Sequence, residues 1–255
     1  MMYRVTCPLS LLLFGALCLG KSKGKPTKEY CDLYLSQPAP FDDAVFYPKS
    51  DTLPPKERNK IKNRSRVCLP KPCEDVEAYS GFIPVDDGSD TSFLFFLHLK
   101  SKVQKAPLLL WLQGGPGNSS LFGQFLENGP LGIDASENLY RRKHTLLHKF
   151  SIIYLDQPVG AGYSFDEKTA VPSYFERGYR THILRFLRRF VRIFNEYAGR
   201  PFYIAGESYG EALISQRFTE AVILGAGHYA AVDKPDGAYY LMTEFMHSEA
   251  LKIEN

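Results

Sequence analysis

The sequence is poor in cysteine, in net charge and in long apolar runs, and each shortage excludes a class of protein. Its 255 residues include only 5 cysteines, too few for a disulfide-dense secreted scaffold. A formal net charge of +3 gives no reason to expect a nucleic-acid partner. No apolar stretch reaches the roughly 20 residues of a membrane-spanning helix, so we expect no stable membrane insertion.

Several sequence patterns are also missing. We find no internal repeat, no residues with metal-ligand spacing, no phosphate-binding loop and no dinucleotide fingerprint, and we therefore expect no cofactor. What is present is an average globular composition, with 44% hydrophobic and 23% charged residues. The chain is long enough to bury a large core.

The N-terminus has the pattern of a secretory signal peptide. Arg4 precedes an apolar run at 9–19, and Gly20 supplies a small residue after that run. We therefore expect residues 1–20 to be removed and the chain to enter the secretory pathway.

The next segment, residues 21–75, is polar and is expected to be extended, with a solvated loop at 48–66. Asn63 begins an Asn-Arg-Ser sequence and is a candidate N-glycosylation site. The cysteines that follow the leader are Cys31, Cys68 and Cys73. The last two are close enough in sequence to form a disulfide, which would leave the first unpaired.

Residues 76–255 have the pattern of an α/β domain. Apolar runs predict strands at 93–99, 108–112, 150–155 and 202–205. A helix is predicted by apolar residues at helical spacing, namely Ile183, Leu187, Phe190, Phe194 and Tyr197. Strand, loop, helix and strand in this order predict an α/β fold with a mostly parallel sheet and flanking helices.

The last of these strands runs into a G-x-S-x-G sequence at 206–210. Glycines on both sides of Ser208 let the chain turn so sharply that the hydroxyl projects above the sheet, which makes this serine the candidate nucleophile. A serine nucleophile needs a base. His228 is the candidate, because it follows an apolar run at 221–224, predicted to be a strand, and a loop of small residues.

A second glycine loop, at 113–117, follows the predicted strand at 108–112. Glycine N–H groups face a substrate without side chains in the way, so this loop is a candidate oxyanion hole. An ordinary strand-to-helix turn would show the same pattern.

Taken together, the motifs resemble the serine carboxypeptidases, and most closely their vitellogenic-like branch. They are WLQGGPGNSS at 111–120, FLENGP at 125–130, DQPVGAGYSF at 156–165, FYIAGESYG at 202–210, and GAGH and DKP within 225–235. The resemblance implies an α/β-hydrolase fold with an inserted cap, and release of C-terminal amino acids from peptides and proteins with a free C-terminus. It also implies an acidic compartment, so a secreted or a lysosomal or endosomal destination is expected.

The same resemblance assigns roles to individual residues. It makes Ser208 the nucleophile and His228 the general base, with the backbone N–H groups of Gly115 and Tyr209 as oxyanion donors. The group that binds the substrate's terminal carboxylate would be Gln113, Gly114, Glu127 and Glu207. Gln113 stands where the family usually has asparagine, a change that keeps the amide chemistry.

The pair of glutamates predicts a pH dependence. Two ionised glutamates would repel a substrate carboxylate, so at least one must hold a proton and donate a hydrogen bond. Burial and like charge both raise a carboxyl pKa. We therefore expect an intact enzyme with this site to work best below neutral pH.

Too little chain separates the nucleophile from the base. Only 20 residues lie from Ser208 to His228, whereas the α/β-hydrolase order places further βα units and the triad acid between them. The family pattern indicates an internal deletion near 210–218, with central strands and the cap missing. Asp233 and Asp236 follow the serine, but neither is expected to replace the lost acid.

We therefore expect a serine-type carboxypeptidase by lineage whose activity is impaired in this form. Loss of the acid alone costs a factor of about 10⁴ in a comparable triad. Two alternatives remain open: a non-catalytic, truncated hydrolase-like protein, and an esterase of the same fold.

Overall fold

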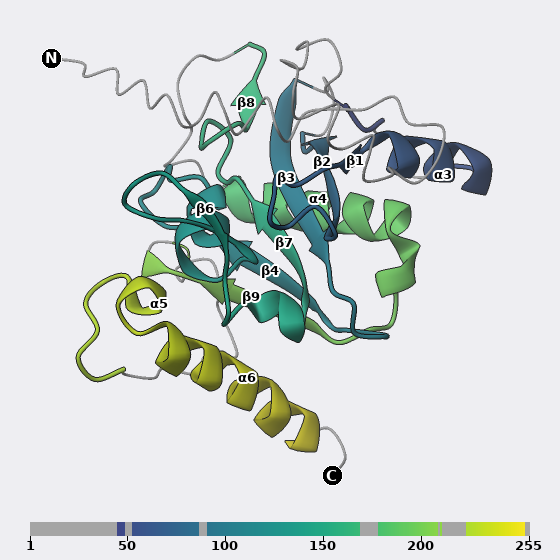
Figure 1. The fold of residues 1–255 in the computed structure, drawn as a ribbon. Coiled ribbons are helices and arrows are strands. Elements are labelled where there is room, and N and C mark those ends of the chain that lie inside the picture. The colour runs from purple at the N-terminus through teal and green to yellow at the C-terminus, as the bar shows by residue number, and fades with distance from the viewer. Residues whose placement is uncertain are drawn as a thin grey trace, which may run out of the picture.

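We describe the fold from a computed structural model, which defines residues 45–48, 53–86, 91–168, 178–208, 210 and 223–252 (Figure 1). The leader predicted at 1–20 lies outside these residues. The helices are α3 (Pro55–Arg64), η2 (Gly123–Glu127), η3 (Leu146–His148), α4 (Tyr179–Ile193), η4 (Asn195–Tyr197), α5 (Ala230–Asp233) and α6 (Pro235–Lys252). Within the described ranges, no helix has the length and apolar character needed to cross a bilayer.

The strands are β1 (Arg66–Val67), β2 (Glu77–Pro84), β3 (Ser92–Lys100), β4 (Leu108–Leu112), β5 (Leu131–Ile133), β6 (Leu139–Arg141), β7 (Ser151–Leu155), β8 (Phe165–Asp166) and β9 (Phe202–Gly206). The main sheet has the order β1-β2-β3-β7-β4-β9, and β8 pairs with β3. β4 lies parallel to both β7 and β9, while the pairs on the β1 side are antiparallel. The sheet is therefore mixed, and its parallel part carries the glycine-loop and serine motifs.

The predicted α/β class is confirmed, and so are the strands predicted at 93–99, 108–112, 150–155 and 202–205. The run LLLWL forms β4, and its alternate side chains face opposite sides of the sheet. One side carries Leu110 into the core beneath α4, and the other carries Trp111 into a second core. Because helices cover both faces, the strand is buried throughout and reads as a continuous apolar run.

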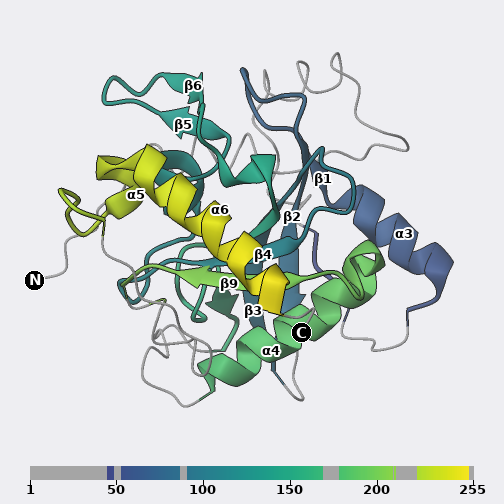
Figure 2. The same ribbon diagram turned by 90° about the horizontal axis from the view of Figure 1, so that it is seen from below.

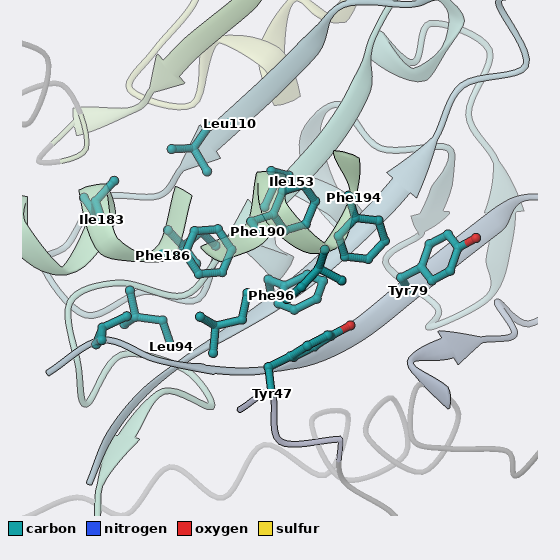
Figure 3. Close-up of a cluster of buried hydrophobic side chains, with 14 of the residues drawn as sticks. Tyr47, Tyr79, Leu94, Phe96, Leu110, Ile153, Ile183, Phe186, Phe190 and Phe194 are labelled. Carbon is teal, nitrogen blue, oxygen red and sulfur yellow. The ribbon is translucent and has the colours of Figure 1, made fainter. Parts of the chain in front are cut away.

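α4 covers one face of the sheet with aromatic side chains (Figure 3). The ring of Phe190 stacks on Phe194 at 4.4 Å between centroids and meets Phe96 of β3 edge-on at 5.5 Å. Burial of each such side chain stabilises the fold by about 1.5–3 kcal/mol. The apolar spacing that predicted the helix therefore also identified the face that packs on the sheet.

The opposite face is covered by η2, the β5–β6 hairpin and α6. Tyr239 and Met242 of α6 pack against the second core, next to Tyr203 and Ala205 of β9. In the view from below, α6 crosses in front of β9 (Figure 2). This helix lies downstream of His228 and was not predicted from the sequence.

The solvated loop predicted at 48–66 is wrong, because residues 55–64 form helix α3. A proline in its first turn and basic residues in its last turn suit a helix without a strong apolar face. Tertiary contacts stabilise it further, since Ile61 packs on the core beneath α4 and Lys62 pairs with Glu196.

The predicted disulfide between Cys68 and Cys73 is also wrong. Cys68 is disulfide-bonded, but the thiol of Cys73 is free and buried and lies 3.4 Å from the carbonyl oxygen of Pro130. Proximity in sequence was a poor guide here, because the turn between the two residues directs Cys73 toward the β5–β6 side.

Candidate active site

The site is built from loops that follow the parallel strands. β4, β7 and β9 run in the same direction, so the loops at 113–120, 156–164 and 207–210 emerge at one edge of the sheet. Open parallel sheets place their ligand sites at this edge. The sheet thereby brings together motifs that lie almost 100 residues apart in the sequence.

Ser208 stands on a strained turn directly after β9. Its φ is +56°, a left-handed conformation that is uncommon for a residue other than glycine and that is expected of a nucleophile elbow. The N–H of Glu207 donates to the carbonyl oxygen of Leu112, which ties the turn to β4 at 3.1 Å. A Cβ at Gly210 would overlap that same oxygen, so only glycine fits there. The hydroxyl-bearing residue is exposed, as a nucleophile must be.

The loop at 113–117 is the candidate oxyanion loop, and it holds Gly115 in a left-handed conformation. Its φ of +118° requires glycine, and its N–H forms no hydrogen bond within the described ranges. The carbonyl oxygen of Gly114, which is buried, accepts from the N–H of Asn118 and closes the loop. Tyr209, the other predicted donor, lies outside the described residues.

Three of the predicted carboxylate-binding residues come together in the fold. The indole Nε1 of Trp111 donates to Oε1 of Gln113 at 2.9 Å, which turns the amide nitrogen the other way. That nitrogen, Nε2, donates to Oε1 of Glu207 at 3.0 Å. Glu127 completes the group from η2, and it approaches because Gly123 lets η2 lie directly against the indole.

Glu127 is the more deeply buried of the two glutamates in this set. It is 1% exposed, and its carboxyl group interacts with the side chains of Glu207 and Gln113. Burial first, and then the neighbouring carboxylate of Glu207, raise the pKa of Glu127 well above its usual range. The protonated glutamate expected from the sequence therefore has a physical basis at this position.

Asp156 is a site residue that the sequence analysis did not single out. Its buried carboxylate accepts from Oγ of Ser119 at 2.6 Å, from the N–H of Ser120 at 2.8 Å and from the N–H of Tyr163 at 2.8 Å. It thereby joins the end of the oxyanion loop to the loop after β7. Burial raises the pKa of Asp156 to about 6, against the effect of these donors. The signal in the sequence was an acid placed directly after a buried strand.

His228 is placed differently from all of these residues. It is exposed, and its ring lies edge-on to Tyr229 at 5.1 Å, while Tyr229 lies near Phe122 beside η2. No hydrogen bond joins His228 to Ser208 or to a carboxylate within the described ranges. The strand predicted before it at 221–224 is wrong where it is described, since Ile223 and Leu224 lie outside any strand.

The aspartates that follow the serine have other contacts. Asp233 accepts from the N–H of Gly227 at 2.6 Å, and Asp236 pairs with His144 at 3.1 Å. Neither replaces the triad acid. Among the described residues, no three His, Cys, Asp or Glu side chains are grouped to hold a metal ion. The predicted deletion near 210–218 lies outside the described residues apart from Gly210.

Comparison with known proteins decides the lineage of this site. The model of the serine carboxypeptidase family matches residues 69–216, which include every motif from WLQGGPGNSS to the G-x-S-x-G sequence around Ser208. The chain belongs to the serine carboxypeptidase family. It is 39% identical to a vitellogenic carboxypeptidase of Aedes aegypti over 152 residues, which are 59% of this chain and 32% of that protein.

A second curated relative gives the same picture. The chain is 33% identical to a probable serine carboxypeptidase of Homo sapiens over 204 residues, 73% of this chain and 43% of the human protein. A crystal structure of a prohormone-processing carboxypeptidase from Saccharomyces cerevisiae is 29% identical, covers 55% of this chain and 32% of its own, and has a TM-score of 0.49. The matched part of the chain spans about a quarter to two-fifths of the length of the curated relatives.

Proposed function

We propose that this chain recognises peptides and proteins through their free C-terminal carboxylate and is built for serine-type carboxypeptidase chemistry, with turnover strongly reduced in this form. The hydrogen bond from Gln113 to Glu207 carries the proposal. It joins the oxyanion loop to the nucleophile turn, so a carboxylate held there lies within one residue of Ser208. That spacing suits removal of the last residue of a peptide.

The residues are arranged for a chemistry in which the hydroxyl oxygen of Ser208 attacks the last peptide carbonyl and its proton passes to the base His228. In this form His228 is too poorly placed to take that proton, so turnover does not depend on it. The negative charge that develops on the carbonyl oxygen is stabilised by the N–H groups of Gly115 and Tyr209. Gln113 and a protonated Glu127 donate hydrogen bonds to the terminal carboxylate, beside Glu207. No cofactor enters these steps.

The reduced turnover follows from the position of the base. An exposed His228 with no carboxylate on its ring has nothing to hold it in the orientation that proton transfer requires. Loss of that orienting acid reduces turnover about 10⁴-fold in a comparable triad. Recognition of the carboxylate depends on other residues and is retained.

Fluorescence of Trp111 tests the recognition step directly. It is the single tryptophan of the chain and bonds to Gln113, so ligand binding at the carboxylate group changes its emission. We expect saturable binding of a blocked dipeptide with a free C-terminus, and at least tenfold weaker binding of its C-terminal amide. Equal binding of acid and amide would contradict the proposal.

The esterase alternative makes the opposite prediction. A buried acid pair has no use in binding a neutral ester, so an esterase would bind the amide as well as the acid. Labelling of Ser208 by a fluorophosphonate separates both enzymes from a non-catalytic protein. We expect slow labelling of the wild type and none of Ser208→Ala, because the hydroxyl is exposed on its turn.

We also propose that the protein belongs to the secretory pathway, with a secreted or a lysosomal or endosomal destination. The leader-like sequence at 1–20 supports this, and so does the disulfide at Cys68, since such bonds persist in oxidising compartments. Asn63 is exposed in the last turn of α3, where a glycan would project from the surface. Mass spectrometry of the mature protein from eukaryotic cells tests all three features.

A further inference from the structure

Arg142 is a buried cation that forms no ion pair within the described ranges. It lies directly after β6 and is 7% exposed. A buried guanidinium without a carboxylate is costly unless its donors are satisfied in another way. The guanidinium carbon of Arg142 lies over the ring of Tyr140, 5.6 Å from the ring centroid, so the ring covers one face of the guanidinium.

Apart from a hydrogen bond of 3.4 Å from Nη2 to the hydroxyl of Tyr140, the side-chain donors of Arg142 bind one short piece of chain. Nη1 donates to the carbonyl oxygens of Gly129 at 2.7 Å and Gln124 at 3.3 Å, and Nη2 donates to that of Phe125 at 2.8 Å. These carbonyls belong to η2 and the turn after it. A helical turn of this kind leaves its last carbonyl oxygens without intrahelical donors, and the guanidinium group of Arg142 supplies those donors.

This turn is the segment that carries Glu127. Asn128, the next residue, is held by the hydroxyl of Tyr154, which donates to its Oδ1 at 2.8 Å, and by Thr145, which donates to its carbonyl oxygen at 2.9 Å. The carboxyl group of Glu127 interacts with Glu207 and Gln113 on the other side of the site. How closely it approaches them depends on what holds the turn, and Arg142 makes the largest number of the bonds that hold it.

We infer that Arg142 is a positioning residue for carboxylate recognition: it holds η2 so that Glu127 faces Glu207, and its charge extends the recognition site with a cation placed behind the turn. The inference rests on the proposed function. The charged groups that act on Glu127 are Glu207 and Arg142, and the buried Tyr154 beside them stays neutral because burial raises its pKa.

The charge of Arg142 shifts the pKa of Glu127 in a known direction. Arg142 lowers the pKa of Glu127 against the stronger effects of burial and Glu207. Removing the charge therefore keeps Glu127 protonated to higher pH. Binding that needs the protonated glutamate would persist to higher pH, although the loosened turn would weaken it at every pH.

The experiment is a pH series of dipeptide binding, read from Trp111 fluorescence, for the full chain in a Ser208→Ala background that prevents turnover. For Arg142→Gln we expect binding about tenfold weaker at pH 5, with the midpoint of its alkaline loss raised by roughly half a pH unit. For Arg142→Lys, which keeps the charge but not the fork, we expect weaker binding at an unchanged midpoint.

Arg141→Gln is the matched control. Arg141 is the preceding residue, half exposed, and pairs with Asp75 and the carbonyl oxygen of Pro72, away from η2. We expect it to bind like the parent. If Arg142→Gln does not fold, the dipeptide affinity of Arg142→Lys tests the inference. Parent-like affinity in both Arg142 variants would overturn this inference alone, whereas no carboxylate-dependent binding by the parent would overturn the proposed function and this inference with it.

Discussion

The two sides of the candidate site differ in how they are held. On the side that precedes the nucleophile, Trp111, Gln113 and Glu207 form a chain of hydrogen bonds at the ends of β4 and β9. On the side that follows it, His228 lies exposed in a loop whose described support is a ring contact through Tyr229 and a bond from Gly227 to Asp233.

In the proposed function, recognition and catalysis therefore depend on different parts of the chain. The recognition residues are held by β4, which is buried throughout, and by the turn that ties Glu207 to it. The base depends on the chain between Ser208 and itself, and only 19 residues lie there. The recognition residues should therefore keep their positions despite the short connection, whereas His228 should not.

The largest effect expected from this comparison is on stability. Phe190→Ala removes a fully buried ring that stacks on Phe194 beneath the sheet, and should lower the free energy of unfolding by about 3–5 kcal/mol. Tyr229→Ala, in the loop that carries the base, should cost less than about 1 kcal/mol because that side chain is 40% exposed. Urea unfolding of both variants measures the contrast; equal losses would mean that the two regions are packed alike.

The second effect concerns acid. His98 is fully buried between the carbonyl oxygen of Ile152 and the hydroxyl of Tyr197, and burial lowers its pKa from 6.5 to about 4. The unfolded chain therefore binds the proton more readily, so this contribution to stability is complete above about pH 6.5 and is lost as the pH falls toward 4. The loss amounts to about 3 kcal/mol.

Substitution isolates that contribution. His98→Gln should be less stable than the wild type at pH 7 but should lose less stability between pH 7 and pH 4.5. Tyr197→Phe removes the same hydrogen bond and leaves the imidazole in place, so it should keep the wild-type acid slope. Glu127 and Asp156, whose pKa values are raised, act in the opposite direction in all three proteins and cancel from the comparison. An unchanged slope in His98→Gln would show that another group is responsible.

The smallest effect is on ligand affinity. Gln113→Leu removes the amide between Trp111 and Glu207 and should weaken binding of a blocked dipeptide at least tenfold, or about 1.4 kcal/mol. His228→Ala should leave that affinity unchanged, because the base is not part of the recognition group. A loss of affinity in His228→Ala as large as that in Gln113→Leu would place the loop over the carboxylate group and remove the distinction between the two sides.

The features that the sequence predicted are those encoded by local pattern. The run LLLWL gave β4, helical spacing around Phe190 gave α4, and the G-x-S-x-G turn gave a strained Ser208. Each of these depends on residues that are neighbours along the chain. The recognition residues were predicted through family motifs, and the structure brings Gln113 and Glu207 together as those motifs imply.

The features that were missed depend on tertiary contact. Arg142 reads as one more basic surface residue until its partners on η2 are seen, and Asp156 reads as the end of a strand. The sequence of helix α3 predicts a loop because it is almost entirely polar, and its packing on α4 has no local signature. Burial of polar groups is set by the fold, so sequence pattern alone could not identify them.

The measurement that tests the account most directly is hydrolysis of the blocked dipeptide by the wild type, Ser208→Ala and His228→Ala, with binding followed in the same samples through Trp111. We expect saturable binding in all three. We expect a wild-type turnover at least about 10⁴-fold below that of an intact triad and unchanged when His228 is replaced. A wild-type rate that falls a hundredfold or more in His228→Ala would contradict it, because the base would then be working against Ser208 in this short chain.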